Sequence, residues 1–149
     1  MATIRLPHDF KEFLKLLNAH RVEYLLIGGY AVGYHGYPRA TADMDIWIAM
    51  HPANAERIVA VLKEFGFDPP ELSPELFLKE CQIIRLGVPP VRIGIATTVS
   101  GVNFSECYSK RVTDVLDGVK VNLISLNHLK INKRASGRHQ DLADLENLP

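Results

Sequence analysis

The sequence from Gly28 to Asp45 reads Gly-Gly-Tyr-Ala-Val-Gly-Tyr-His-Gly-Tyr-Pro-Arg-Ala-Thr-Ala-Asp-Met-Asp, a glycine pair followed by two aspartates that one residue separates. The apolar run 24–27 ahead of it predicts a buried strand. Gly28 and Gly29 are therefore expected where this strand ends, and neither carries a side chain that would exclude a ligand. The glycine pair thus predicts a place where a ligand approaches the backbone.

A second strand is predicted over 44–49, where the apolar residues alternate along the chain. Because successive side chains of a strand point to opposite faces, Asp43 and Asp45 are expected on one face. An Asp-x-Asp pair alone is more often a solvated edge, and a glycine pair alone is more often a tight turn. The glycines end one strand and the aspartates begin the next, which brings both pairs to one end of a sheet and indicates a site.

The chemistry of this predicted site is that of a metal and a phosphate. Two carboxylates on one face suit Mg²⁺, which takes few carboxylates and fills its other positions with water and phosphate oxygens. Backbone amides near Gly28 and Gly29 would hold the phosphates, and Arg39 and Thr41 could add charge and a hydroxyl. The stretch therefore favours a magnesium and nucleotide site.

The pattern of elements along the chain predicts an α+β fold in which a mixed sheet carries helices packed mainly on one face. One domain over residues 1–149 accounts for the whole length. Asp9 is a candidate N-cap, Ser125 can cap a later helix, and Asp117-Gly118 predicts a hairpin turn. Helices are expected over 10–19, 31–35, 52–65, 73–75, 104–109, 126–136 and 140–147, and strands over 22–27, 44–49, 82–86, 91–96, 111–116 and 119–124, with a Gly-Val-Pro-Pro turn over 87–90.

Composition excludes several classes of protein. Lysine and arginine equal aspartate and glutamate at 17 each, so the overall charge does not favour indiscriminate binding to nucleic acid or membranes. The N-terminal sequence lacks the apolar core of a signal peptide, and no segment is long and apolar enough to cross a bilayer, which predicts a cytoplasmic protein. Cys81 and Cys107 are too few for a disulfide framework or a zinc cluster and are interpreted as buried or unreactive thiols.

Gly28-Gly29 with Asp43-Met44-Asp45 resembles the signature of the nucleotidyltransferase superfamily, which is built on the palm of DNA polymerase beta. The wider run with His35-Gly36, Arg39 and Thr41 is similar to small nucleotidyltransferase-like proteins of bacteria and archaea, including the AbiEii toxin type. The C-terminal segment also resembles theirs, at Ile124, Ser125, Leu126, Leu129, Lys133, Ala135, Gly137, Arg138, Asp141, Ala143, Asp144 and Leu145.

The resemblance implies transfer of a nucleoside monophosphate from a nucleoside triphosphate such as ATP to an acceptor, which could be RNA or protein. It implies that Asp43 and Asp45 ligate Mg²⁺ or Mn²⁺ and act in catalysis, while Gly28 and Gly29 pack under the triphosphate. Lys133 is also assigned to nucleotide binding by the resemblance. A partner protein, as in a toxin and antitoxin pair, or a second copy of the chain could complete the site.

Relatives carry a third acid on a neighbouring strand, and this chain places Gly94 at that position. Strand alternation independently puts Gly94 on the side of the site. The resulting hypothesis is a protein that binds nucleotide with magnesium but transfers it slowly unless Glu80, Glu106, Asp141 or a partner supplies the acid. The alternative is a non-catalytic binding or regulatory module, and a metal hydrolase ranks last because no histidine cluster is present.

The remaining candidates each have a structural interpretation beside the functional one. Lys133 and Arg138 are predicted to bind the phosphates of the nucleotide, and a solvated helix face is the structural alternative for both. For Asp141 and Asp144 an exposed helix face, or a salt link to Arg138, is favoured over a metal role. His35 is close enough in sequence to reach the site, or it holds the turn after the glycine pair. For Trp47, packing is favoured over stacking on a base.

Overall fold

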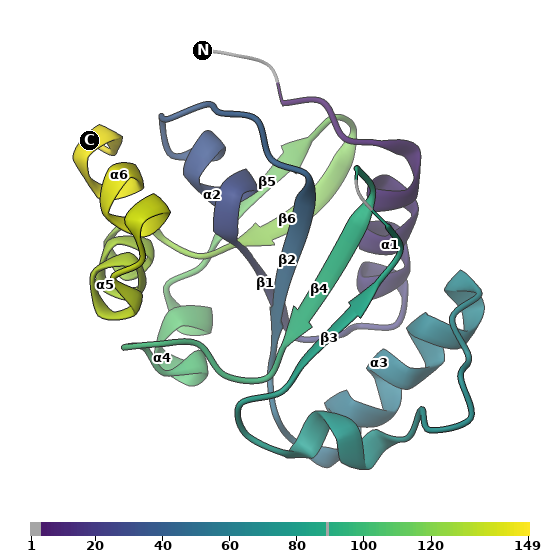
Figure 1. Cartoon of the computed structure of the whole chain (residues 1–149). Coiled ribbons are helices and arrows are strands. Elements are labelled where there is room, and N and C mark those ends of the chain that lie inside the picture. The colour runs from purple at the N-terminus through teal and green to yellow at the C-terminus, as the bar shows by residue number, and fades with distance from the viewer. Residues whose placement is uncertain (1–3, 89) are drawn as a thin grey trace.

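The computed structural model describes residues 4–88 and 90–149, and it contains a six-stranded mixed sheet with helices on both sides (Figure 1). The strands are ordered β3-β4-β2-β1-β6-β5. In chain order the elements are α1 (His8–Ala19), β1 (Tyr24–Ile27), α2 (Gly28–Tyr34), β2 (Asp43–Ile48), α3 (Pro52–Phe65), the 3-10 helix η1 (Pro74–Leu78), β3 (Ile83–Leu86), β4 (Arg92–Ala96), α4 (Phe104–Ser109), β5 (Val112–Leu116), β6 (Val119–Leu123), α5 (Leu126–Ser136) and α6 (His139–Asn147).

The centre of the sheet is formed by strands that are far apart in the sequence. β2 pairs antiparallel with β1 on one side and parallel with β4 on the other, while β1 also pairs parallel with β6. In this register Asp45 lies opposite Ile27 on β1 and opposite Gly94 on β4. The end of β1, the start of β2 and the middle of β4 therefore meet at one place.

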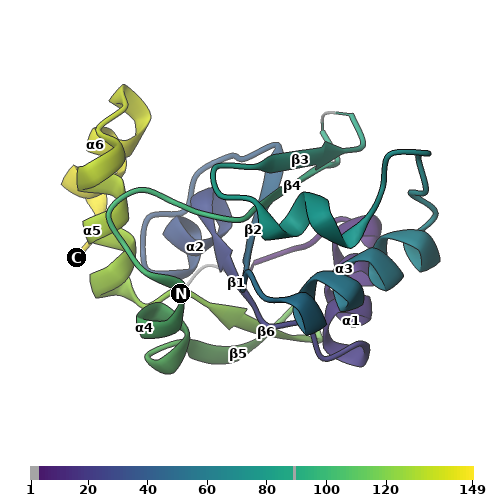
Figure 2. The same ribbon diagram turned by 90° about the horizontal axis from the view of Figure 1, so that it is seen from below.

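Alternation along β1 and β2 divides the apolar side chains between two clusters. Leu26 and Ile46 pack with α1 and α3 on one face, whereas Leu25, Ile27 and Trp47 pack on the other with residues of α4 and α5. Figure 2 shows α1 and α3 side by side and apart from α4, α5 and α6. The predicted α+β fold with a mixed sheet is confirmed. The helices cover both faces and not mainly one, because both faces of the central strands are apolar and both need cover.

Local signals set several element ends as the sequence predicted. Gly66 and Gly137 adopt left-handed conformations, with φ of 101° and 62°, and end α3 and α5. Ser125 caps α5, since its Oγ accepts a hydrogen bond from the backbone N–H of His128 at 3.2 Å. The predicted cap at Asp9 is wrong: α1 begins at His8, so Asp9 lies in its first turn, where the helix dipole favours an acidic side chain.

Both predicted hairpins form. Asp117 and Gly118, with φ of 49° and 81°, connect β5 to β6 in the conformation that such two-residue turns require. β3 and β4 pair antiparallel, as expected, but residue 89 of the predicted turn over 87–90 lies outside the described residues. Across the described ranges, no helix combines the length and apolarity needed to span a membrane.

Candidate active site

Helix α2 begins at the glycine pair itself, earlier than the predicted start at Ala31. Gly28 has a φ of 68°, and a Cβ atom there would collide with Oδ2 of Asp45. A Cβ atom on Gly29 would lie 2.7 Å from Oγ1 of Thr41. The glycine pair is thus needed because the start of β2 packs directly against the backbone that joins β1 to α2.

Asp43 and Asp45 point into one cleft, as alternation along β2 predicted. The cleft has a volume of about 510 Å³ and lies among the end of β1, the strands β2, β3 and β4, and helix α5. Besides the two aspartates, the residues that line it and bear on its chemistry are Gly28, Arg85, Gly94, Lys133, Ser136 and Arg138. The cleft therefore combines two carboxylates with three basic side chains.

The pKa of Asp45 is raised, chiefly because the carboxyl is buried and secondly because the charge of Asp43 lies nearby. The charges of Lys133, Arg85 and Arg138 oppose this shift. A carboxylate that is desolvated and repelled by a second one is stabilised by any cation placed between them. The basic side chains around the cleft thus stabilise the charged form of Asp45, which burial and the charge of Asp43 disfavour.

Asp43 is held by an arginine that the sequence interpretation did not assign to the site. Nε of Arg92 donates to Oδ1 at 3.0 Å and Nη2 donates to Oδ2 at 2.8 Å, so the ion pair is bidentate. The two residues are direct neighbours across the β2–β4 pairing. Alternation already placed Arg92 on the same face as Gly94, which is the signal that could have identified it.

Gly94 lies next to Asp45 without supplying any ligand. A Cβ atom at this position would be 3.1 Å from Oδ1 of Asp45, so the side chain of a larger residue would enter the site.

Glu80 is exposed and is not among the residues lining the cleft. Glu106 lines a different hollow, of about 530 Å³, together with His128. Within residues 4–88 and 90–149, no three histidine, cysteine or acidic side chains gather as a metal site.

The oxygen ligands of the cleft suit one Mg²⁺ ion and are too few for a second. Asp43 and Asp45 supply hard oxygen ligands on one strand face, and the absence of side chains at Gly28 and Gly94 leaves space beside Asp45. Two-metal sites share acidic ligands between both ions, and the described residues offer no third carboxylate here. Water and phosphate oxygens would have to complete the coordination of a single ion.

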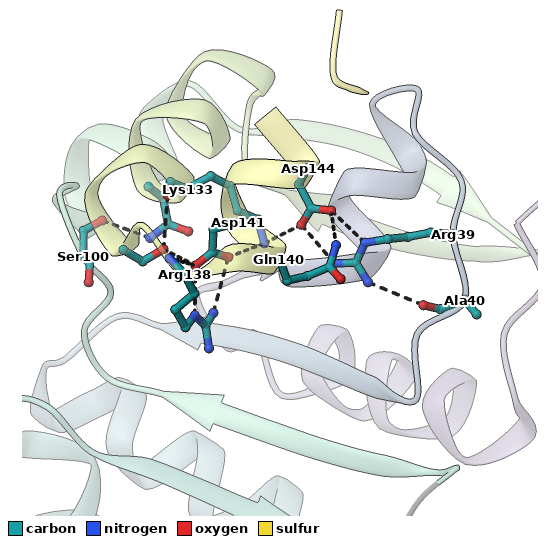
Figure 3. Close-up of polar contacts among 10 residues, drawn as sticks. Arg39, Ala40, Ser100, Lys133, Arg138, Gln140, Asp141 and Asp144 are labelled. Carbon is teal, nitrogen blue, oxygen red and sulfur yellow. Dashed lines mark hydrogen bonds and ion pairs between the residues drawn. The ribbon is translucent and has the colours of Figure 1, made fainter. Parts of the chain in front are cut away.

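Asp141 and Asp144 are buried, with 1% and 0% of their surface exposed, so the predicted exposed helix face is wrong. Lys133 lies between them, and its Nζ is 3.1 Å from Oδ1 of Asp141 and 3.1 Å from Oδ2 of Asp144. The predicted link to Arg138 is present, since Nε donates to Oδ2 of Asp141 at 2.9 Å (Figure 3). These contacts hold α5 and α6 together and fix Lys133 at the cleft.

Hydrogen bonds decide the ionisation of this network. Burial alone raises the pKa of Asp141, but hydrogen bonds from Arg138, Ser136 and Lys133 outweigh it and hold the pKa well below the usual range. Asp141 is therefore a charged partner of Lys133 and has no spare oxygen to replace the acid missing at Gly94. Its carboxylate stabilises the wall of the cleft.

Arg39 and Thr41, both predicted to bind nucleotide, are placed beside the site and not among the residues that line the cleft. Arg39 forms a bidentate ion pair with Asp144, with Nε 2.8 Å from Oδ1 and Nη2 3.0 Å from Oδ2 (Figure 3). Thr41 donates to the backbone oxygen of Asp43 at 3.2 Å. In this conformation the two residues connect the start of β2 to α6 and to the glycine pair.

The structure also decides between the interpretations of His35 and Trp47. Nε2 of His35 donates to the backbone oxygen of Ile124 at 2.7 Å, and burial lowers its pKa, so it holds the turn after α2. Trp47 is 2% exposed, and its Nε1 donates to the backbone oxygen of Thr97 at 3.2 Å. Its ring packs edge-on against Phe104. Trp47 is a core residue and is not available to stack on a base.

Comparisons with known proteins identify the fold and the family of the chain. A crystal structure of a "putative nucleotidyltransferase" (TM1012) from Thermotoga maritima is similar, with a TM-score of 0.62 and 17% identity, over 92% of this chain and 88% of that one. At this identity the likeness concerns the fold. Among curated proteins, none matches the chain by sequence. Residues 5–148 match the model of a family described as nucleotidyltransferase of unknown function (DUF6036). Since the match spans nearly the whole chain, the protein belongs to this nucleotidyltransferase family.

Proposed function

We propose that this protein binds a nucleoside triphosphate with Mg²⁺ in the cleft at Asp43 and Asp45, and transfers a nucleoside monophosphate to an acceptor at a low rate. The observation that carries the proposal is the charge distribution of the cleft, in which the two carboxylates face Arg85, Lys133 and Arg138. A divalent cation suits the carboxylates, and triphosphate oxygens suit both that cation and the basic side chains.

Each group of residues has a distinct part in this function. Asp43 and Asp45 would hold Mg²⁺ or Mn²⁺, which when bound neutralises charge on the phosphate oxygens. Arg85 and Arg138 are exposed at the cleft and can bind phosphates directly. Lys133, which is buried and paired with two aspartates, adds fixed positive charge to the wall and holds it in place.

A low rate follows from the glycine at position 94. Without a carboxylate there, the chain lacks a ligand for a second ion next to the incoming hydroxyl group. A catalytic metal contributes several kcal/mol of charge stabilisation, and about 1.4 kcal/mol corresponds to tenfold in rate, so the loss is on the order of a thousandfold. Binding of the triphosphate depends less on the second ion and should persist.

The test is a transfer assay with Mg²⁺, each labelled nucleoside triphosphate and a pool of RNA and protein acceptors. Slow labelling of an acceptor is expected, and Asp45→Asn should abolish it because that variant removes a metal ligand while keeping the shape of the side chain. Glu106→Gln serves as the matched control, since Glu106 lines a different hollow. Labelling that persists in Asp45→Asn would contradict the proposed site.

Gly94 also favours a second candidate, a binding or regulatory module without transfer activity. In that case a non-hydrolysable triphosphate binds in calorimetry while the protein by itself transfers no label. A partner protein, as in a toxin and antitoxin pair, could supply the acid, and adding it should then raise the rate. Nucleoside triphosphates are cytoplasmic metabolites, so both candidates are compatible with the cytoplasmic location expected from the sequence.

A further inference from the structure

The ion pair between Arg92 and Asp43 occupies the carboxylate that a metal ion would use. Both oxygens of Asp43 accept from the guanidinium group, at 3.0 and 2.8 Å. We propose that Arg92 is the resident counter-ion of Asp43 and excludes a free divalent cation from the site, so that the metal enters only together with the triphosphate. The claim that Arg92 excludes the free metal ion does not depend on a nucleotide. The claim that the metal enters with a triphosphate rests on the proposed function.

The sheet keeps Arg92 in position to compete. Asp43 and Arg92 are paired residues of the parallel strands β2 and β4, and the next pair on the same face is Asp45 with Gly94. The two aspartates therefore face different neighbours, an arginine for Asp43 and an empty position for Asp45. A metal that needs both carboxylates must displace the guanidinium group, because a cation placed at the same oxygens repels it.

The exposure of this ion pair allows it to open. The side chains of Arg92 and Asp43 are 37% and 31% exposed, so each can be solvated when they separate. The pair between Arg39 and Asp144 has the same bidentate geometry, but the Asp144 side chain is 0% exposed and would be left buried without its partner. Of these two pairs, only Arg92 with Asp43 is suited to exchange a guanidinium for another cation.

A metal that arrives with a triphosphate has an advantage over the free ion. The phosphate oxygens supply several of its ligands, so fewer must come from the protein, and the phosphates also bind the basic side chains of the cleft. This additional binding free energy can offset the opening of the ion pair. Arg92 thereby makes metal binding depend on the nucleotide, and it acts as a positioning residue for Asp43.

The experiment is a titration of the full-length chain with Mn²⁺ alone, in which electron paramagnetic resonance measures the free ion. Arg92→Gln should bind Mn²⁺ at least fivefold more tightly than the wild type, and Arg92→Lys, which loses the bidentate geometry but keeps the charge, should lie between them. Arg57→Gln is the matched control, because it removes the same charge from α3, which covers the other face of the sheet. Adding Asp43→Asn to Arg92→Gln should cancel the gain.

Equal Mn²⁺ affinity in the wild type, Arg92→Gln and Arg92→Lys would overturn the proposal. A second titration, in the presence of a non-hydrolysable triphosphate, should tighten Mn²⁺ binding more in the wild type than in Arg92→Gln, because the variant has no ion pair to open. An equal effect in both proteins would overturn the coupling to nucleotide. If no triphosphate binds at all, the proposed function fails, while the result with Mn²⁺ alone still decides whether Arg92 excludes the metal.

Discussion

Gly94 is the residue at which the site departs from a complete set of acids, and one substitution there can test the consequence. Gly94→Asp would add a carboxylate next to Asp45, with the Cβ atom 3.1 Å from Oδ1, so a small shift of the neighbour is needed. We expect Gly94→Asp to bind Mn²⁺ at least tenfold more tightly than the wild type, because three carboxylates repel one another until a cation binds. Calorimetry with Mn²⁺ would measure this.

Gly94→Asn is the control for that substitution, since it has nearly the same shape and no charge. It should leave Mn²⁺ affinity close to that of the wild type, and both variants should lose some stability through crowding at Asp45. In the absence of metal, Gly94→Asp should be the less stable of the two because of charge repulsion. A tighter metal site in Gly94→Asn as well would show that crowding, and not the added charge, changes the affinity.

At the scale of residues, the sequence predicts which face of a strand a side chain lies on better than which other side chain it contacts. The common face of Asp43, Asp45 and Gly94 follows from strand alternation, which is a local property of the backbone. Alternation along β4 also indicates the face of Arg92, but its ion pair with Asp43 could not be predicted, because the register between β2 and β4 depends on the whole sheet. Burial of Asp144 likewise depends on residues from distant elements.

Helices α5 and α6 form one unit with the loop before β2. Lys133 joins α5 to α6, and Arg39 joins the loop to α6. Lys133→Met keeps most of the length of the side chain but leaves Asp141 and Asp144, which are buried, without their shared cation. Removing one partner of a buried ion pair costs about 3–5 kcal/mol, so we expect a loss of that order in the free energy of unfolding. Urea denaturation followed by circular dichroism would measure it.

Lys63→Met is the matched control for Lys133→Met, because Lys63 also lies in a helix, α3, but is exposed. It should change the free energy of unfolding by less than about 0.5 kcal/mol. If the two variants were equally stable, the remaining ion pairs of Arg138 with Asp141 and of Arg39 with Asp144 would be sufficient, and Lys133 would contribute little to the packing of α6.

The same two helices predict how stability changes in acid. The pKa values of Asp141 and Asp144 are lowered in the folded protein, because hydrogen bonds from cationic side chains outweigh the effect of burial. Between these values and the usual pKa of about 3.9, the unfolded chain binds more protons, so stability falls as pH decreases. We expect the free energy of unfolding to be retained above about pH 5 and to decline below about pH 4.

The variant Asp141→Asn identifies the source of this decline. It lacks the stabilisation from the charged carboxylate at neutral pH, so it should unfold at lower urea concentration than the wild type. Because the wild type loses that same contribution in acid, the difference between the two proteins should shrink as the pH falls towards 3. A difference that stays constant between pH 7 and pH 3 would contradict a lowered pKa for Asp141.

The ends of elements were predictable where a local signal sets them, as at Gly66, Gly137 and the Asp117-Gly118 turn. The start of α2 was predicted too late, because glycine is a poor helix former and the first residues of this helix are two glycines. Asp45 and Thr41 pack closely against the backbone of these two glycines and leave no space for larger side chains there. This contact joins residues of different elements, so no local pattern in the sequence indicates it.

For the molecule as a whole, the order of strands is what assembles the site. The sheet places β1 and β4 on either side of β2, so Gly28, Asp45 and Gly94 meet although they are far apart in the chain. Helix α5, which follows the last strand, then brings Lys133 to the same cleft. The sequence predicted the α+β class and these residues, whereas their meeting required the topology.

If the cleft binds a magnesium nucleotide, the ligand must stabilise the whole fold, because it contacts residues from β1, β2 and α5 at once. At a concentration of about one hundred times the dissociation constant, a ligand adds roughly 2.7 kcal/mol, which for a chain of this size corresponds to a rise in Tm of about 5–10 °C. We expect this rise with Mg²⁺ and a non-hydrolysable triphosphate in a thermal shift assay, and no rise with the nucleoside alone. Asp45→Asn should lose most of it, while the unliganded Tm of the variant serves as its own reference. A rise of the same size in Asp45→Asn would place the nucleotide outside the cleft and away from the metal site.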